Sequence, residues 1–419
     1  MNSASKKNAW RAEGAGTTDW HRRLDSGVAD KYLIVSCDTH ANEPLDVFTS
    51  RVEAKYQDRL PRVKVDEDGT QWLLSDGWEP QPVKVAPTRT DLMPTAEDFE
   101  SYEVLSPYSD KMDEEDVRRA SSGRSVQQRL DDEVSQGVDA EIVFGQKGLL
   151  AFATSDPAFS GAMCRAWNRW ALETFSSHDQ IMPMAMIAPG LLDEAIAEVQ
   201  WAAANGFHGV LLPNRPIFHK LTEPRNPLEY NDKRFEPLWA AIAETGLPIT
   251  LHVSTGEDPR AVRGNGGAIT NFVCHSMTTT IEPMVQMISS GVFERHPTLR
   301  LGTIESGIGW VPWLLQQMDY SYRAHHMWVR PVIPQEPSFY YKRNCFAAFI
   351  EEPEALDRAI QAGLEDNIVW SNDYPHHEGS FPHTKASVER QMANLSENQR
   401  AKVLGLNAAR IFNIAAAQS

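Results

Sequence analysis

The chain has 419 residues, of which 42% are hydrophobic, and its formal net charge is −17. A surface this acidic repels phosphate backbones and anionic membranes, so the composition argues against nucleic acid or a membrane surface as a partner. No apolar run reaches about 18 residues, the length that indicates a transmembrane helix.

The polar N-terminal segment, residues 1–31, predicts an arm ahead of the folded domain. It lacks the apolar stretch of a secretory signal. The cysteines are scattered and form no Cys-x-x-Cys pair, a pattern typical of reduced thiols. These are Cys37, Cys164, Cys274 and Cys345. We therefore expect a cytoplasmic protein whose folded domain spans residues 32–419.

Eight short apolar runs follow one another along this domain, and amphipathic stretches such as Leu192–Asn205 separate most of them. The runs are Tyr32–Cys37, Ala140–Phe144, Ile181–Ile187, Gly209–Leu212, Pro248–Leu251, Leu299–Ile304, Cys345–Ile350 and Asn367–Trp370. Near-continuous apolar runs indicate parallel strands covered on both faces. Eight such units predict an α/β fold, specifically a (β/α)8 TIM barrel. A doubly wound open sheet is the alternative, but no glycine-rich dinucleotide turn follows the first run.

Two insertions interrupt the pattern. The first, residues 45–123, follows the first strand and contains a predicted hairpin of Val63–Val65 and Gln71–Leu74, joined at Asp68-Gly69. The second, residues 320–341, follows the sixth strand and is rich in aromatic residues, His and Pro. Insertions at the C-terminal ends of barrel strands commonly shape the substrate pocket, so both are candidate lids. Covering the barrel or contacting another subunit is the open alternative, and such surfaces favour a homo- or hetero-oligomer.

Residues of metal-binding type recur where predicted strands end. Asp38 and His40 follow the first strand, two residues apart and therefore on one side of an extended segment. His252 ends the fifth strand, Glu305 the sixth and Asp373 the eighth. All five meet at the C-terminal mouth of a barrel, where such enzymes carry their active sites. Carboxylates and imidazoles crowded there repel or stay unpaired without a cation, so we predict that these residues bind a divalent metal.

Four stretches extend this pattern into longer motifs. They are Asp38-Thr39-His40-Ala41-Asn42-Glu43-Pro44, Leu251-His252, Ser290-Gly291-Val292-Phe293-Glu294-Arg295-His296-Pro297 and Ser371-Asn372-Asp373-Tyr374-Pro375-His376. The motifs resemble those of the amidohydrolase superfamily, in particular the branch of aminocarboxymuconate-semialdehyde decarboxylase. The resemblance covers most of residues 32–413. It implies that a divalent metal is bound by the first-strand pair, the strand-five His and the strand-eight Asp, which here are Asp38, His40, His252 and Asp373.

The chain departs from that superfamily in two places. Many members begin with His-x-His, whereas this chain has Asp38-x-His40. The decarboxylases carry a catalytic His in a His-Gly-Gly-Gly turn after strand six, and Glu305 takes that place here. The resulting carboxylate-rich set suits iron or manganese and can bridge two ions, with His376 and His275 as further ligands. The whole pattern resembles a superfamily branch that includes dinuclear non-haem metal hydroxylases.

The favoured prediction is accordingly a dinuclear iron or iron–manganese oxygenase that uses O2 to hydroxylate a small organic acid or its thioester. Glu305, Asp373 and His376 are its predicted catalytic residues. The alternative is a mononuclear zinc or manganese hydrolase or decarboxylase, in which Glu305 or Asp373 handles protons. A third reading is a non-catalytic metal-binding subunit that supports an active partner. Arg215, after the fourth strand, is a candidate contact for a substrate carboxylate, and Trp310 a candidate pocket residue.

Overall fold

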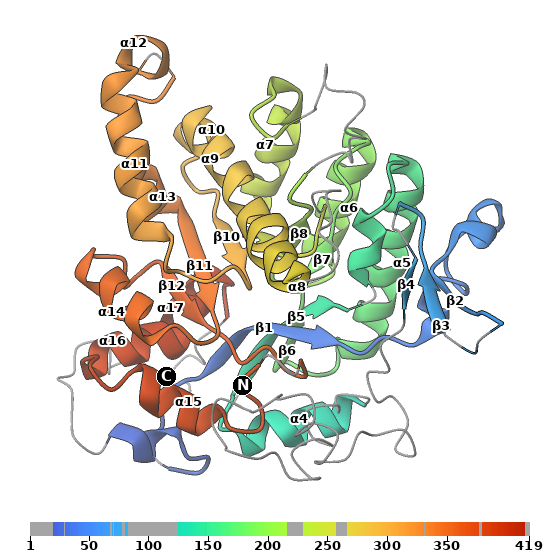
Figure 1. The fold of residues 1–419 in the computed structure, drawn as a ribbon, viewed down its shortest axis with the longest axis horizontal. Helices are drawn as coiled ribbons and strands as arrows, with labels where there is room; N and C mark the ends of the chain where they lie inside the picture. Colours follow the sequence, from blue (N-terminus) through green and yellow to red (C-terminus); the bar gives the residue numbers. More distant parts are fainter. Residues whose placement is uncertain are drawn as a thin grey trace.

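The predicted strands are present in the computed structural model (Figure 1). It describes residues 20–28, 30–67, 69, 71–77, 80–82, 125–146, 148–215, 229–256, 266–330, 332–376 and 379–414. The parallel strands are β1 (Val35–Ala41), β5 (Ala140–Gly145), β6 (Ile181–Pro183), β7 (Ala185–Met186), β8 (Val210–Leu212), β9 (Ile249–His252), β10 (Leu301–Ile304), β11 (Cys345–Phe349) and β12 (Ile368–Trp370).

These strands form the predicted (β/α)8 barrel. They lie in chain order in two hydrogen-bonded sheets, β1-β5-β6 and β7-β8-β9-β10-β11-β12. The sheets meet at Met184, which separates β6 from β7 and donates its N–H to Val143. On the other side, a parallel bridge between Thr39 and Tyr374 links β1 to the segment that follows β12. The third predicted strand is therefore divided between the two sheets.

Helices pack outside the strands (Figure 1). They are α4 (Val126–Ser135), α5 (Pro157–Phe175), α6 (Leu192–Ala204), α7 (Glu236–Thr245), α8 (Gly267–Thr270), α9 (Ile281–Ser289), α10 (Val292–Arg295), α11 (Val311–Ala324), α12 (His326–Val329), α13 (Pro337–Asn344), α14 (Pro353–Gln361), α15 (Thr384–Gln391), α16 (Glu397–Ala401) and α17 (Asn407–Ile411). α7 ends at Gly246, whose φ of 70° is the left-handed conformation of a helix C-cap. None of the described helices is long and apolar enough to cross a membrane.

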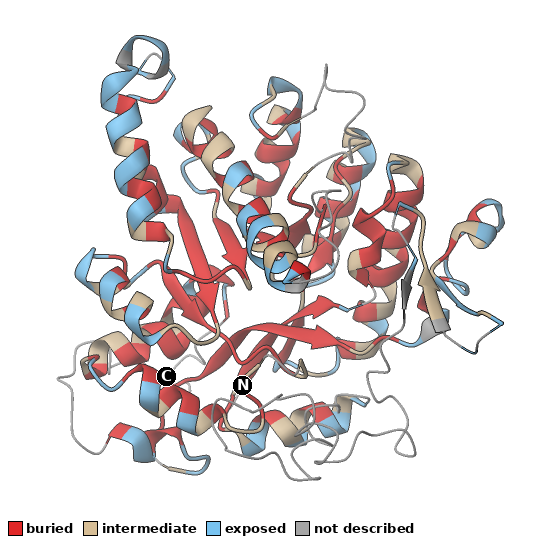
Figure 2. Cartoon of the chain, in the orientation of Figure 1, coloured by how far each residue is buried: buried red, intermediate tan, exposed pale blue. Residues whose placement is uncertain are grey.

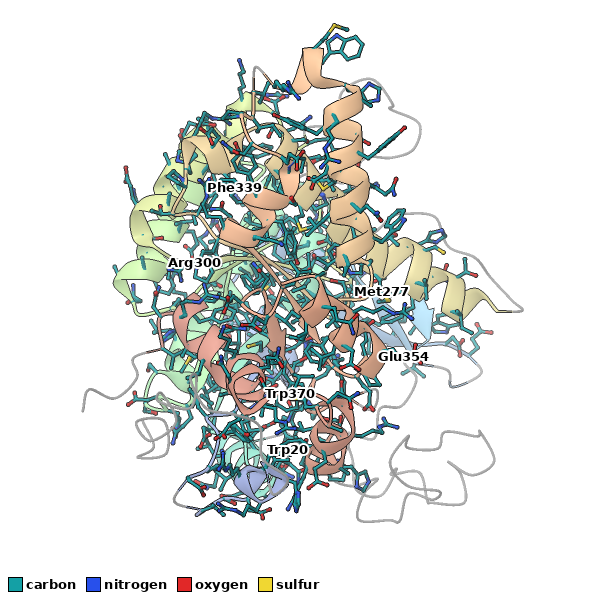
Figure 3. All side chains as sticks on the ribbon, turned by 90° about the vertical axis from the view of Figure 1, so that its left-hand side faces the viewer. Trp20, Met277, Arg300, Phe339, Glu354 and Trp370 are labelled. Atoms are coloured by element: carbon teal, nitrogen blue, oxygen red, sulfur yellow. The ribbon has the colours of Figure 1, made fainter. Side chains whose placement is uncertain are left out.

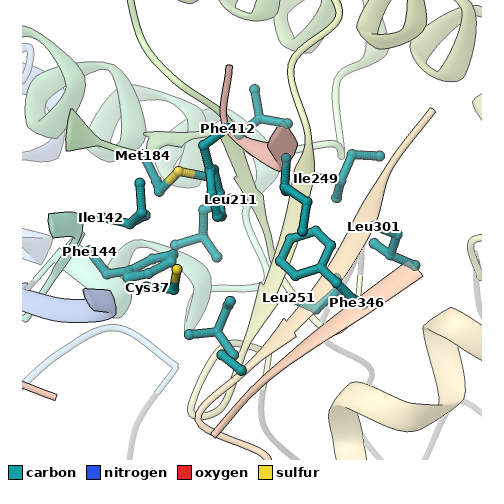
Figure 4. Close-up of a cluster of buried hydrophobic side chains, with 14 of the residues drawn as sticks. Cys37, Ile142, Phe144, Met184, Leu211, Ile249, Leu251, Leu301, Phe346 and Phe412 are labelled. Carbon is teal, nitrogen blue, oxygen red and sulfur yellow. The ribbon is translucent and has the colours of Figure 1, made fainter. Parts of the chain in front are cut away.

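The parallel strands are buried along almost their whole length, as their near-continuous apolar sequences predict (Figure 2). Side chains from neighbouring strands fill the barrel, and Figure 4 shows Phe144, Leu211, Leu251 and Phe346 packed together there. All four cysteines are free thiols, and among them only Cys274 is exposed. The barrel interior is thus a packed core, and the chemistry is confined to its rim.

The first insertion contains the predicted hairpin. Strands β2 (Arg62–Val65) and β3 (Gln71–Leu74) pair antiparallel, and β4 (Gln81–Pro82) extends the sheet. Gly69 has the positive φ that the predicted turn requires, whereas Asp68 and residues 83–124 lie outside the described residues. Two short 3-10 turns, Leu45–Val47 and Ala54–Arg59, precede the hairpin. Within the predicted arm, the turn Trp20–Leu24 packs its two terminal side chains into the core.

The second insertion, residues 320–341, is largely helical and lies at the end of the barrel opposite the strand mouth. Tyr340 on α13 donates its hydroxyl to Glu294 of α10, the helix that precedes β10. Val332 lies against Gly291, beside the same helix. The interpretation of this insertion as a lid is therefore wrong, because α11 carries the chain away from the mouth. Its exposed apolar side chains, including Phe339 in Figure 3, leave contact with another subunit as a prediction.

A close approach between β10 and β11 gives a test of the core. Gly302 pairs with Phe346, and a Cβ at position 302 would lie 2.1 Å from the Phe346 ring. We expect Gly302→Ala to lower the free energy of unfolding by about 1–3 kcal/mol through overpacking. Chemical denaturation measures this change. Adding Phe346→Leu should make room, so the double variant should lose less stability than the two single effects combined; strict additivity would contradict the packing contact.

Candidate metal centre

The structure brings the five predicted residues together at the rim of the barrel. Asp38 and His40 lie on β1, and His252 ends β9. Glu305 directly follows β10, and Asp373 follows β12 by three residues. The ligand atoms of Asp38, His40, His252 and Glu305 lie within 4.8 Å of one another, and those of His40, Asp373 and His376 form an overlapping group. The ends of four strands from both sheets thus converge on one buried point.

Short distances connect these groups. The Nε2 atom of His252 lies 3.2 Å from Asp38 Oδ1 and 3.5 Å from Glu305 Oε2. His40 Nε2 lies 3.5 Å from the same Asp38 oxygen and 3.6 Å from Asp373 Oδ1. The side chains of all five residues are nearly inaccessible to solvent. The arrangement is a compact set of oxygen and nitrogen donors that face one another.

Both histidines present the same ring nitrogen to this centre. His40 Nδ1 lies 3.2 Å from the carbonyl oxygen of Gly145, and His252 Nδ1 lies 2.8 Å from that of Val253. A carbonyl oxygen only accepts hydrogen bonds, so each Nδ1 carries a proton and each Nε2 faces the carboxylates. Nε2 of the neutral His40 keeps its lone pair, whereas Asp38 and Glu305 raise the pKa of His252. Second-sphere carbonyls of this kind fix the tautomer of metal-binding histidines.

Two of the carboxylates stand on left-handed backbone. Glu305 has a φ of 58° and Asp373 a φ of 53°, a conformation that non-glycine residues rarely adopt and that marks functional sites. The turn after Glu305 is fastened by Glu352, whose Oε2 accepts the N–H groups of Ile308 and Gly309. Gly307 in that turn has a φ of 69°, and a Cβ there would lie 2.6 Å from Glu352. Aiming Glu305 inward therefore depends on this turn.

The electrostatics of the centre favour a bound cation. Burial and the neighbouring Asp373 raise the pKa of Glu305 well above its ordinary range. Burial and His376 lower the pKa of His40 to about 3, so this imidazole is neutral. Burial acts to raise the pKa of Asp38, but His252 and His40 lower it overall. Asp38 Oδ2 and His40 Nε2 are buried without a hydrogen-bond partner among the described residues. A divalent metal supplies what these atoms lack.

The remaining predicted residues have mixed positions. His376 stacks on His40 with ring centroids 4.1 Å apart and contacts Asp373 and Gln146 at 3.0 Å and 2.7 Å. His275 lies on the π-helical turn Asn271–Ser276 after β9, and its ring is in neither group of converging donors. The structure therefore does not support His275 as a ligand, because that turn carries the ring away from the strand ends.

The two predicted substrate contacts also differ from each other. Trp310 is half-buried and donates its indole N–H to Ser306, so its polar edge is engaged within the Glu305 turn. Arg215 lies 3.9 Å from Glu282, a partly exposed and weak ion pair. It lines a small open cleft between the loops that follow β5, β7 and β8, together with Phe152, Thr154 and Pro213. None of the five centre residues lines this cleft, and the link between the two is Asn214, next to Arg215 in the chain, which donates to the carbonyl of His252.

Sequence reasoning missed two residues that shape the rim. Gln146 directly follows β5, and its Oε1 contacts His376 Nε2. The rule that active-site residues follow barrel strands could have found it. Glu43 is buried and accepts the N–H groups of Gln146, Gly148 and the Trp167 indole. It belongs to the first-strand motif, but its partners lie more than 100 positions away, and no local pattern indicates them.

Comparisons with known proteins agree with this architecture. The profile of the amidohydrolase family matches residues 37–414, so the chain belongs to that family. Over 217 residues it is 25% identical to gamma-resorcylate decarboxylase from Rhodococcus jostii (strain RHA1), a match that covers 50% of this chain and 63% of that protein. The chain therefore spans about three fifths of the length of this curated relative.

Solved structures of similar fold cover nearly the whole chain. An amidohydrolase from Mycobacterium avium subsp. paratuberculosis K-10 superposes with a TM-score of 0.71 at 22% identity, covering 91% of this chain and 99% of its own. A variant of 5-carboxyvanillate decarboxylase from Novosphingobium aromaticivorans DSM 12444, with bound manganese and 3-methoxy-4-hydroxy-5-nitrobenzoic acid, has a TM-score of 0.61 at 16% identity, covering 93% and 99%. These likenesses establish the fold.

The predicted dinuclear oxygenase is wrong. Among the relatives reported above and further structures of similar fold, those whose names state a reaction are decarboxylases, and one of them holds manganese. The geometry supplies a physical reason. The two groups of converging donors share His40, which has one ring nitrogen left after the contact of Nδ1 with Gly145, so they do not form two separate ligand sets. The alternative, a mononuclear centre, fits the donor set better.

The centre predicts metal binding that depends on Asp38. Metal-depleted protein should bind about one Mn²⁺ per chain, and Asp38→Asn should weaken binding by more than about 100-fold, because its carboxylate is a central donor. Isothermal titration calorimetry measures both quantities. Asp156→Asn is the control, since it removes a carboxylate yet leaves an equally good N-cap for α5. Equal Mn²⁺ affinities of the Asp38 variant and wild type would exclude this site.

Proposed function

We propose that this protein is a mononuclear, metal-dependent decarboxylase of a small organic acid. The observation that carries the proposal is the buried cluster of carboxylate and imidazole donors at the barrel mouth. The sequence similarity to gamma-resorcylate decarboxylase supports the choice of reaction. Mn²⁺ is the favoured ion because carboxylate-rich sites suit it and because a structural neighbour holds manganese.

Asp38, His40, His252 and Asp373 are the residues we assign to the metal. A divalent ion bound by them would bind and polarise the oxygen atoms of the acid. The contacts of His40 Nδ1 and His252 Nδ1 with backbone carbonyls fix the orientation of the two imidazoles before a ligand binds. The low exposure of the four side chains excludes water from the reacting bond. Preorganised groups of this kind stabilise developing charge without further rearrangement.

Glu305 is the proton donor in this proposal. It occupies the place where related decarboxylases carry a histidine, and its carboxyl lies 3.5 Å from His252 Nε2, at the edge of the donor cluster. In the reaction, Glu305 protonates the substrate carbon that bears the carboxylate. The bond to the carboxylate then breaks, its electron pair stays on the substrate and CO2 leaves. One proton therefore replaces one carboxylate, with no redox step.

Arg215 is the residue we assign to a second anionic or hydroxyl group of the substrate. It lines the cleft beside Asn214, whose side-chain amide holds the carbonyl of His252. A guanidinium binds oxygen acceptors through several donors at once. Its partner Glu282 is exposed and distant, so a substrate can displace that contact.

The reaction can be tested with the acids that name the relatives. Mn²⁺-loaded protein should release CO2 from 2,6-dihydroxybenzoate or 5-carboxyvanillate. In D2O, the product should carry one deuterium on the carbon that lost its carboxylate. Metal-depleted protein is the control and should be inactive. Esters and amides of these acids are added to the same panel of substrates. Hydrolysis of an ester or amide bond, with no CO2 released from the acids, would refute the decarboxylase and favour a hydrolase.

The role of Glu305 is separable from metal binding. Glu305→Gln should retain about one Mn²⁺ per chain but lower kcat by about 10²–10⁴-fold, because the amide cannot donate a proton from an acidic group. Elemental analysis and CO2 release measure the two effects on one sample. Loss of the metal together with activity would instead make Glu305 a ligand.

Arg215→Ala should raise KM by about tenfold or more, the effect of losing a charged hydrogen bond, and leave kcat nearly unchanged. Arg234→Ala is a matched control, because Arg234 is an exposed arginine paired only with the nearby Asp232 among the described residues. The assignment fails if both variants share the wild-type KM.

A further inference from the structure

Side chains close the seam of the barrel between β1 and the segment after β12. The described parts of these two segments share one backbone bridge, at Thr39 and Tyr374, in which His40 donates its N–H to Tyr374 at 2.7 Å. Next to it, Ser36 donates its hydroxyl to Asn372 Oδ1 at 2.7 Å, and the Asn372 N–H donates back to Ser36 Oγ at 3.0 Å. The reciprocal hydrogen bonds of Ser36 and Asn372 thus replace the backbone hydrogen bonds of a regular sheet. They do so close to Asp38, His40 and Asp373.

A buried polar network from α4 reaches this seam. Asn372 Nδ2 donates to both carboxylate oxygens of Glu133, each at 3.1 Å. Arg129 donates to the backbone oxygen of His40 and, at 2.7 Å, to Glu141. Its guanidinium also lies 5.0 Å from the ring centroid of Tyr374. All of these side chains are buried, and burial together with Glu141 raises the pKa of Glu133.

Stability alone does not account for such a network. A buried ionic group is commonly no more stabilising than apolar residues of similar volume, because desolvation offsets the attraction. It does fix geometry, since each hydrogen bond has a direction. The contacts end on the His40 carbonyl and on Asn372, the residue that precedes Asp373. They therefore act on the two segments whose relative position sets the spacing of the donors.

We propose that Glu133 and Arg129 are positioning residues for the metal, acting through Asn372 and the backbone of His40. The inference rests on the metal centre assigned above and is independent of the reaction. Asp373 follows Asn372 in left-handed backbone, so its carboxylate has no regular strand to hold it. Metal–ligand distances tolerate deviations of only about 0.2 Å. A small shift of Asn372 would therefore displace the Asp373 carboxylate and lower the affinity for the metal.

Glu133→Gln tests the proposal directly. The new amide would face the Asn372 amide with a donor, and Asn372 cannot turn over because its Oδ1 already accepts from Ser36 and Tyr374. We expect Mn²⁺ to bind about tenfold more weakly, the scale of an outer-sphere change. A chelator competition assay measures the affinity, and the electron paramagnetic resonance spectrum of bound Mn²⁺ should report the altered ligand geometry.

Glu198→Gln is the matched control. Glu198 is also buried, accepts from the amide of Asn168 at 2.8 Å and pairs with Arg169 at 2.6 Å. It lies on α6, and none of its contacts is with a metal-binding residue. We expect this variant to lose stability but to keep the wild-type Mn²⁺ affinity and spectrum. If Glu198→Gln weakened Mn²⁺ binding as much as Glu133→Gln does, the loss of affinity would reflect general destabilisation, and the proposal would be overturned.

A double variant reverses the direction of the critical hydrogen bond. In Glu133→Gln with Asn372→Asp, the new amide donates to the new carboxylate, which still accepts from Ser36 and Tyr374. The network keeps the same number of carboxylates. We expect Mn²⁺ affinity to return to within about threefold of wild type, whereas each single variant stays weakened. Wild-type affinity in Glu133→Gln overturns the positioning role, and failure of wild type itself to bind Mn²⁺ overturns the metal centre as well.

Discussion

The rest of the site depends on one electrostatic constraint, the burial of Asp38, Glu305 and Asp373 at the same point. Three carboxylates removed from water repel one another, and each loses hydration that the protein must replace. Burial keeps His40 neutral, whereas Asp38 and Glu305 raise the pKa of His252, and a metal ion would take the place of the proton on its Nε2. A divalent cation offsets this repulsion and at the same time coordinates the donor atoms that lack a hydrogen-bond partner. Without a cation, the cluster would destabilise the barrel.

The same constraint explains the structure of the seam. A regular ladder between β1 and β12 would set the spacing of Asp38, His40 and Asp373 by the pleat of the strands alone. The structure instead uses one backbone bridge and a pair of side chains there, so that Asp373 can turn inward on left-handed backbone. The regularity lost from the sheet is replaced by hydrogen bonds from α4. Site geometry thus takes precedence over strand regularity at this one place.

Much of this could be predicted from the sequence because strand burial and strand ends leave local signals. The apolar runs located all eight strand positions, and the rule that chemistry follows strands located Asp38, His252 and Asp373. The division at Met184 and the far-side position of residues 320–341 leave no such signal, since both depend on tertiary packing. Asn372 and Glu133 are 239 positions apart in the chain. The oxygenase interpretation failed because it took a carboxylate-rich donor set and a resemblance as signs of oxygen chemistry, whereas the relatives whose names state a reaction are decarboxylases.

Charge balance gives Glu305 a particular meaning. With Asp38 and Asp373 bound to it as carboxylates and His40 and His252 as neutral ligands, a divalent ion would bring the cluster to zero net charge. Ionised Glu305 would make it negative and repel an incoming carboxylate. The neutral acid form admits an anionic substrate and already holds the proton that decarboxylation consumes. Burial and Asp373, which raise the pKa of Glu305, therefore favour the protonation state that both binding and chemistry require.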